Sequence, residues 1–340
     1  MRVLVTGGTG FIGSHLAADA RRRGAEVIVL GLTDYVVERQ NAAWLESQGI
    51  EVVSGSVTDA SVCAAAMQGV THVHHLAVAM REAAIDDAYF DTVNIEGTRH
   101  LLAAAHAAGV RRFTYCGTIG VFGHRAPGIT CEGSPLAPGN AYERTKLAGG
   151  RLTLDFHRET GLPVVVLRPA DVYGPRDRRL LKLFRGVDAG LFPLLGDGSG
   201  RHHMVYIDDV VSAFREAETL EAAIGGTFII AGPEACTLRE LLARVAEACG
   251  RKRYGFRLPL TPVLAVAGLV EDAAAVVRVR PPIYRRRVEF FTSDSEFNTT
   301  RARTTLGWTP MTGLSEGIAT TCRWYREAGL MKRRPEGSDG

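Results

Sequence analysis

The sequence predicts an α/β fold, a doubly wound parallel sheet with a smaller C-terminal α/β domain. Two observations carry this prediction. Through the first half of the chain, short apolar runs rich in β-branched residues alternate with alanine-rich helical segments. After residue 174 the alternation loosens, and proline, glycine and arginine become frequent. Because the early runs are apolar throughout, we expect a sheet that helices cover on both faces.

Six early runs are predicted as buried strands and two later runs as isolated strands. The early runs are RVLVT (2–6), EVIVL (26–30), IEVVS (50–54), HVHHL (72–76), RFTYC (112–116) and PVVVL (163–167). The later runs are HMVYI (203–207) and TFIIA (227–231), and a long helix is predicted at 88–108. We expect residues 1–174 to form one domain, to which 204–232 returns. Residues 175–203 and 233–330 are expected to form the second domain, and 331–340 a flexible polar tail.

Composition excludes several classes of function. The 340 residues carry 40 basic and 37 acidic side chains, a net charge of +3, which gives no electrostatic reason to expect nucleic-acid binding. Six scattered cysteines, without a C-x-x-C spacing, argue against a zinc site and a disulfide framework and favour the cytoplasm. The apolar stretch 258–279 contains Glu271 and Asp272, so we predict a buried helix pair and no membrane span.

A glycine-rich turn stands at the start of the chain. In VLVTGGTGFIGSHLA (3–17), Gly7, Gly10 and Gly13 follow a predicted strand and precede a predicted helix. Glycine permits the tight turn and lets the backbone approach a pyrophosphate at the helix N-terminus. This context predicts a dinucleotide site. At its adenosine end, Asp34 would bind the ribose and Arg39 could meet a 2′-phosphate, so we expect NAD and leave NADP open.

Three polar side chains suggest hydride-transfer chemistry. Tyr142 and Lys146 lie four residues apart in NAYERTKLAG (140–149), so one helix face presents both. Thr118 follows the predicted strand 112–116, at the sheet edge where ligands bind. Thr118 can hydrogen-bond a substrate hydroxyl or carbonyl, and Tyr142 can carry its proton. Lys146 would lower the pKa of the phenol, and it can also hold the nicotinamide ribose.

Together these motifs resemble the extended short-chain dehydrogenase/reductases of the NAD-dependent epimerase/dehydratase family. The matching segments are TGGTGFIG (6–13), HLAV (75–78), NIEGT (94–98), AYERTK (141–146), LRPADVYGP (167–175), MVYIDDVVSAF (204–214) and ARTTLGWTP (302–310). The resemblance implies a Rossmann-type cofactor domain, a substrate-binding second domain, and a homodimer formed by helices 88–108 and 141–160. It also implies cofactor contacts by Phe11, Ile12, Leu76 and Ala77, and a supporting role in the active site for Asn94.

Departures from the family pattern narrow the chemistry. The dehydratases, decarboxylases and epimerase–reductases of the family place an acid or a cysteine two residues after the serine or threonine, where this chain has Gly120, which follows Ile119. Neither Ile119 nor Gly120 can act as an acid or a base. The remaining chemistry is hydride transfer at one carbinol carbon, with Tyr142 as the proton carrier. We therefore predict a nucleotide-sugar 4-epimerase, or alternatively a dehydrogenase or ketoreductase of a non-nucleotide alcohol or ketone. A catalytically inactive relative is disfavoured because Asn94, Thr118, Tyr142 and Lys146 are all present.

The candidate substrate residues also differ from the family pattern. Asp171 stands where nucleotide-sugar enzymes often have asparagine near the diphosphate, and a carboxylate would repel phosphate. The family's R-D-F triplet is replaced by His202, His203 and Met204, with Arg201 displaced by one position. We expect Thr118, Asp171, Arg201 and His202 to contact the substrate. Neighbouring histidines on a strand face opposite ways, so no metal site is predicted. The basic run 176–185 is either a solvated face or an anion clamp.

Overall fold

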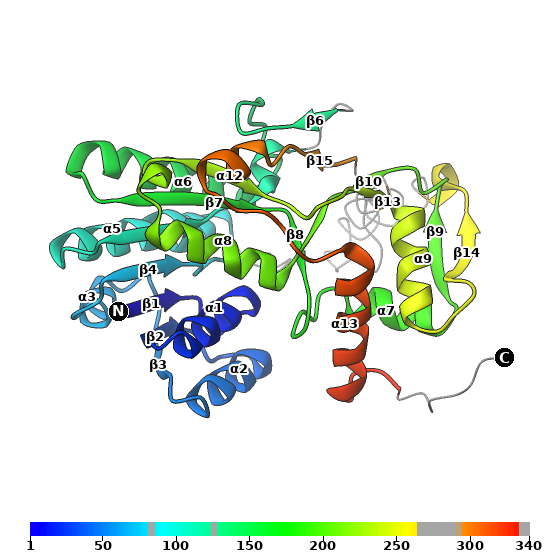
Figure 1. The fold of residues 1–340 in the computed structure, drawn as a ribbon, viewed down its shortest axis with the longest axis horizontal. Coiled ribbons are helices and arrows are strands. Elements are labelled where there is room, and N and C mark those ends of the chain that lie inside the picture. The colour runs from blue at the N-terminus through cyan, green and yellow to red at the C-terminus, as the bar shows by residue number, and fades with distance from the viewer. Residues whose placement is uncertain (81–85, 124–127, 264–290, 292–293, 333–340) are drawn as a thin grey trace.

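The computed structural model describes residues 1–80, 86–123, 128–263, 291 and 294–332 (Figure 1). At its centre lies one seven-stranded sheet in the order β12-β7-β5-β4-β1-β2-β3, with every neighbouring pair parallel. The strands are β1 (Arg2–Thr6), β2 (Glu26–Gly31), β3 (Glu51–Ser54), β4 (His72–His75), β5 (Arg112–Cys116), β7 (Val164–Pro169) and β12 (Thr227–Ile230). The predicted doubly wound α/β fold is confirmed.

Helices cover both faces of this sheet. One face packs against α1 (Phe11–Arg22), α2 (Val36–Glu46) and α8 (Ile207–Thr219), and the other against α3 (Ala60–Ala66), α5 (Gly97–Ala107) and α6 (Ala141–Thr160). Successive residues of β1 show the reason. Val3 and Val5 are buried under the first group of helices and Leu4 under the second, so a strand between two helical layers must be apolar throughout.

Four short strand pairs and further helices are described outside the central sheet. The pairs are β10 (Arg201–His202) with β13 (Cys236–Thr237), β11 (Met204–Tyr206) with β8 (Asp171–Tyr173), β14 (Gly255–Leu258) with β9 (Phe192–Leu195), and β15 (Glu296–Phe297) with β6 (Ile129–Thr130). The helices α7 (Leu181–Asp188), α9 (Leu238–Ala248) and α13 (Leu314–Glu327) gather with β9 and β14 at the right of Figure 1, and we call this group the second lobe. Short α12 (Thr300–Thr305) packs against β12 of the central sheet. The predicted domain boundaries stay a prediction.

Several expectations for the C-terminal half can be placed on this fold. None of the six cysteines, all of which lie in the described ranges, forms a disulfide, and the sulfur atoms of Cys249 and Cys322 lie 3.7 Å apart between α9 and α13. The predicted tail starts at Met331, which is only 7% exposed, and its residues from 333 onward lie outside the described part. The predicted helix pair at 258–279 also lies outside it beyond residue 263. In the described ranges no helix has the length and apolarity to cross a membrane.

The helix predicted at 88–108 is present but is not regular. It consists of α4 (Asp87–Asp91), a π-helical turn η1 (Thr92–Glu96) and α5. A π turn inserts one extra residue into a helix and is often found at functional sites. Asn94 lies in this turn. Helices α5 and α6 pack side by side, and the homodimer predicted on these segments stays a prediction.

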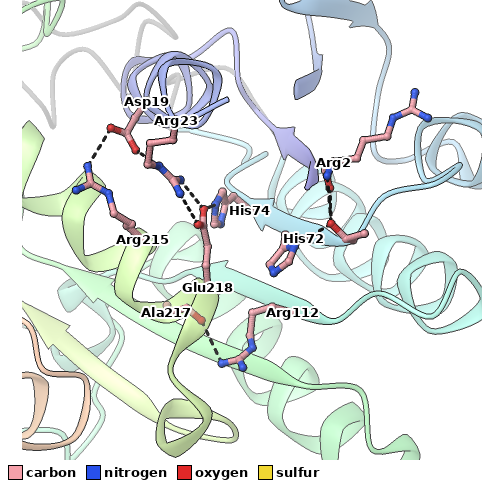
Figure 2. Close-up of polar contacts among 10 residues, drawn as sticks. Arg2, Asp19, Arg23, His72, His74, Arg112, Arg215, Ala217 and Glu218 are labelled. Atoms are coloured by element: carbon pink, nitrogen blue, oxygen red, sulfur yellow. Dashed lines mark hydrogen bonds and ion pairs between the residues drawn. The ribbon is translucent and has the colours of Figure 1, made fainter. Parts of the chain in front are cut away.

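A buried ion network holds α1 and α8 on the same face of the sheet (Figure 2). Glu218 of α8 accepts hydrogen bonds from both terminal nitrogens of Arg23, each at 2.9 Å, and lies 2.9 Å from His74 Nε2 on β4. Arg23 and Arg215 both pair with Asp19 of α1. Burial alone would raise the pKa of Glu218, but the hydrogen bonds from His74 and Arg23 outweigh it and lower the pKa to about 2.

This network makes the fold sensitive to acid. Because the pKa of Glu218 is lower in the folded chain than its ordinary value of 4.5, its stabilisation is complete above pH 4.5 and is lost as the pH falls toward 2. We expect Glu218→Gln to lower the free energy of unfolding at pH 7 by about 3 kcal/mol, because Arg23 loses the buried carboxylate that it pairs with. The variant should also show a flatter dependence on pH in that window. Urea unfolding at pH 7, 4 and 3 measures both effects.

A surface ion pair provides the control for this prediction. Glu26 pairs with Arg2 at 3.2 Å, but its side chain is 65% exposed, against 1% for Glu218. Glu26→Gln should therefore change the free energy of unfolding by less than about 1 kcal/mol. Equal effects of the two substitutions would contradict the role assigned to the buried network.

Candidate active site

The turn between β1 and α1 brings two backbone segments into direct contact. Gly7 has φ +66°, and a Cβ there would lie 2.7 Å from the amide nitrogen of Ala77 and 2.7 Å from the carbonyl carbon of Leu76. A Cβ on Gly13 would lie 2.4 Å from the carbonyl oxygen of Gly7. Side chains are therefore excluded at both glycines. The structure thus brings the loop 6–13 and the segment after β4 together, as the sequence predicts for a cofactor site.

The start of α1 suits a pyrophosphate. Gly10 is the residue before the helix, and no side chain of the described chain caps the helix there. The first amide groups of a helix lack partners within it, so those of Phe11, Ile12 and Gly13 are the donors that the helix start offers to an anion. The donor set fits the pyrophosphate of a dinucleotide. These residues would hold the cofactor by backbone contacts.

The adenosine end of this site lacks the carboxylate that dinucleotide-binding domains commonly have at the end of the second strand. Strand β2 ends at Gly31, where a Cβ would lie 2.5 Å from Thr9 Oγ1, so the strand end itself cannot carry a carboxylate. Asp34 lies exposed in the loop that follows. Arg39 donates to the backbone carbonyls of Thr33, at 3.1 Å, and of Asp34, at 2.6 Å, and so orders this loop. The ribose contact of Asp34 stays a prediction.

Asn94 connects three elements at the active site. Its Oδ1 accepts a hydrogen bond from the amide of Ala79 at 2.8 Å, and its Nδ2 donates to Thr145 Oγ1 at 2.9 Å. Asn94 is 1% exposed, so both groups are satisfied away from water. The π turn therefore ties α6 to the segment after β4, which agrees with the supporting role that the resemblance implies.

Tyr142 and Thr118 meet between α6 and the end of β5. Asn140 caps α6 through a hydrogen bond from the amide of Glu143, so Tyr142 lies in the first turn. Burial raises the pKa of Tyr142 to about 12, and hydrogen bonding to Thr118 and the charge of Arg179 oppose the rise. Without the cofactor the phenol is therefore neutral at physiological pH.

Lys146 lies one turn further along α6 and is almost fully buried. Its side-chain nitrogen lies 4.2 Å from the centre of the Tyr115 ring. Burial lowers the pKa of Lys146 to about 8, and the nearby Cys116 opposes the change. Burial raises the pKa of Cys116 to about 11, so it is a neutral thiol there. Tyr142 and Lys146 thus lie one turn apart on α6. The effect of Lys146 on the pKa of the Tyr142 phenol stays a prediction.

A carboxylate that the sequence analysis missed lies beside Gly120. A Cβ at Gly120 would lie 3.1 Å from Cγ and 3.5 Å from Oε1 of Glu143, and 3.4 Å from Thr118 Oγ1. The space next to Thr118 is thus filled by a side chain of α6. The Glu143 Oε2 atom accepts a hydrogen bond from the amide of Gly139 at 2.7 Å. Spacing along the chain could not reveal this contact, because 23 residues separate Gly120 from Glu143.

The predicted substrate residues are only partly brought together. Asp171 is exposed at the start of β8 and interacts electrostatically with Arg179, a residue of the basic run 176–185. The guanidinium of Arg179 lies 5.6 Å from the centre of the Phe11 ring and is held by Asp177, which is fully buried. Part of that run therefore faces the site and is not simply a solvated surface.

Arg201 and His202 lie on β10, where successive side chains point to opposite faces. Arg201 pairs with Glu296 at 2.8 Å, and His202 is 3% exposed. The substrate contacts of Arg201 and His202 stay predictions. Within the described residues, no group of three or more histidine, cysteine, aspartate or glutamate side chains is arranged to bind a metal ion.

Comparison with known proteins identifies the class. The model of the NAD dependent epimerase/dehydratase family matches residues 3–231. A UDP-glucose 4-epimerase from Mycolicibacterium smegmatis is 33% identical over 340 residues, covering 96% of this chain and 99% of that protein. Sterol demethylase protein B from Methylococcus capsulatus is 28% identical over 345 residues, covering 97% of this chain and all of that protein. A dTDP-glucose 4,6-dehydratase structure from Streptomyces venezuelae, with NAD and TYD bound, has a TM-score of 0.78 at 28% identity and covers 98% of this chain and 99% of its own.

The fold and the site therefore define an NAD-dependent enzyme with a Rossmann-type domain. The chain belongs to the NAD dependent epimerase/dehydratase family. The resemblance drawn from the glycine loop, Thr118, Tyr142 and Lys146 is confirmed at this level.

The Asn94 contacts lead to a stability prediction. Asn94→Ala should lower the free energy of unfolding by about 2 kcal/mol, because the Ala79 amide and the Thr145 hydroxyl lose buried partners. Thr92→Ala, at an exposed position of the same π turn, is the control and should stay within about 0.5 kcal/mol of the starting protein. Urea unfolding compares the two variants. Equal losses in the free energy of unfolding would mean that the hydrogen bonds of Asn94 do not stabilise the fold more than an exposed side chain of the same turn.

Proposed function

We propose that this chain is an NAD-dependent 4-epimerase of a nucleotide-linked sugar. The observation that carries the proposal is the arrangement of Thr118, Tyr142 and Lys146 beside the glycine loop, with one proton-carrying phenol at its centre. An epimerase of this kind oxidises one carbinol carbon and reduces it again from the other face. The chemistry of NAD, when bound, is to accept and return the hydride.

Each side chain has a distinct role in this proposal. Thr118 orients the substrate hydroxyl toward Tyr142, and Tyr142 removes the hydroxyl proton as the carbonyl forms. The phenol needs positive charge nearby to act as a base, because its pKa is about 12 in the cofactor-free protein. The ammonium of Lys146 supplies part of that charge, and an oxidised nicotinamide supplies more. Return of the proton from Tyr142 completes the cycle.

The similarity to a UDP-glucose 4-epimerase over nearly the whole chain supports a nucleotide-sugar substrate. A second candidate is a dehydrogenase or ketoreductase that acts on an alcohol or ketone without a nucleotide. The exposed carboxylate of Asp171 favours it, because that charge opposes a diphosphate. The similarity to sterol demethylase protein B supports the same alternative.

An assay of net cofactor change separates the two candidates. The protein is incubated with NAD and UDP-glucose or its C4 epimer, with the sugar followed by NMR and the cofactor by absorbance. The proposal predicts interconversion of the two sugars with no net formation of NADH. Net reduction of the cofactor, or consumption of reduced cofactor with a free ketone alone, would favour the second candidate.

The proton carrier can be tested by removing one atom. Tyr142→Phe should lower kcat by at least ~10²-fold, because the acid–base group is lost while the ring remains. Tyr89→Phe is the control, since Tyr89 lies 43% exposed on the neighbouring α4. Turnover by Tyr142→Phe within about threefold of the starting protein would refute the assignment.

A substitution at Glu143 tests whether a second acid–base group takes part in the reaction. If Tyr142 alone moves the proton, Glu143→Gln should keep kcat within about threefold, because glutamine can still accept the hydrogen bond from Gly139. A loss as large as that of Tyr142→Phe would instead show that the carboxylate beside Gly120 is used in the reaction. Melting temperatures of both variants exclude misfolding as the cause.

A further inference from the structure

Arg176 has a backbone conformation that its side chain does not favour. It has φ +72°, and among the described residues it is the one non-glycine residue with positive φ. It lies just after Gly174 and Pro175, where the chain leaves β8 toward α7 of the second lobe. Such a conformation costs free energy and persists where surrounding contacts enforce it, often at functional sites. The contacts that Arg176 makes therefore show which part of the structure holds it in this conformation.

The contacts of Arg176 and of the preceding Pro175 are made with residues of α2 and α1, and α1 begins directly after the glycine loop. The guanidinium carbon lies 3.8 Å from the centre of the Trp44 ring on α2, and a terminal nitrogen donates to Asn41 Oδ1. Burial lowers the pKa of Arg176 to about 10, so it remains charged at neutral pH. The preceding Pro175 carbonyl lies 3.0 Å from His15 Nε2 on α1. Burial lowers the pKa of His15 to about 4, so the ring is neutral and donates its Nε2 proton to that carbonyl.

Asn41 connects Arg176 to the glycine loop. Its Nδ2 donates to the carbonyl oxygen of Thr9 at 2.7 Å, and Asn41 and Thr9 are 4% and 3% exposed. On the other side of the same peptide unit, the amide of Gly10 donates to the carbonyl of Gly7 at 3.0 Å. The Thr9–Gly10 peptide is therefore held at both ends, directly before the first amides of α1.

We propose that Arg176 is a positioning residue for the cofactor loop, which acts through Asn41 to fix the Thr9–Gly10 peptide for the pyrophosphate of NAD. A loop that is already ordered loses less conformational entropy when it binds, so the contact raises affinity for NAD without touching it. The inference is independent of the sugar or alcohol substrate, because it concerns NAD binding alone.

Titration calorimetry with NAD tests this in the full-length protein stripped of nucleotide. Arg176→Ala and Asn41→Ala should each weaken NAD binding by about tenfold, the scale of one lost hydrogen bond at a buried site. The double variant should bind no more weakly than the weaker single variant, because both changes break the same connection. Arg178→Ala is the control, since Arg178 is exposed and contacts Gln40 at the surface.

A second variant separates positioning from general stability. Arg176→Gly removes the side chain and also the strain of positive φ, so it should unfold at a higher temperature than Arg176→Ala. If Arg176 positions the loop, both variants should bind NAD equally weakly despite their different stabilities. The proposal is overturned if NAD affinity follows stability, if Arg176→Ala binds NAD within about twofold of the starting protein, or if the losses of Arg176→Ala and Asn41→Ala add in the double variant.

Discussion

The close approach of two backbone segments at the centre of the sheet is the constraint on which the site depends. Strands β1 and β4 are neighbours, and the chain order of the sheet reverses between them. The turn after β1 therefore lies against the segment after β4, and the contact between Gly7 and Ala77 is too close for any side chain at position 7. In open parallel sheets this reversal creates the crevice in which ligands bind. The cofactor site thus follows from the strand order.

The side chains proposed to be catalytic come from separate elements, and buried polar contacts fix these elements relative to one another. Asn94 in the π turn bonds both to the segment after β4 and to Thr145 on α6. The same helix carries Tyr142 and Lys146, and Thr118 lies two residues after the end of β5. A shift of α6 would therefore disturb the proton carrier and the segment beside the cofactor together.

Much of this was predictable from the sequence because it depends on local pattern. The apolar strands, the glycine turn and the four-residue spacing of Tyr142 and Lys146 each lie within a few neighbouring residues. The two hydrogen bonds of Asn94 in the π turn were not predictable, because Ala79 and Thr145 lie far from it along the chain. The same holds for the carboxylate of Glu143 beside Gly120 and for the link from Arg176 to Thr9. The substrate contacts of Arg201 depend on how β10 is oriented, which residue spacing does not determine.

This site is proposed to hold NAD and to recycle it during each turnover. The most direct test is to purify the protein, denature it, and identify and quantify the released nucleotide by mass spectrometry. An epimerase regenerates its cofactor in every cycle and has no need to release it, so we expect close to one equivalent of NAD per chain. A protein that is purified without nucleotide and then binds added NADP more tightly than NAD would refute this proposal.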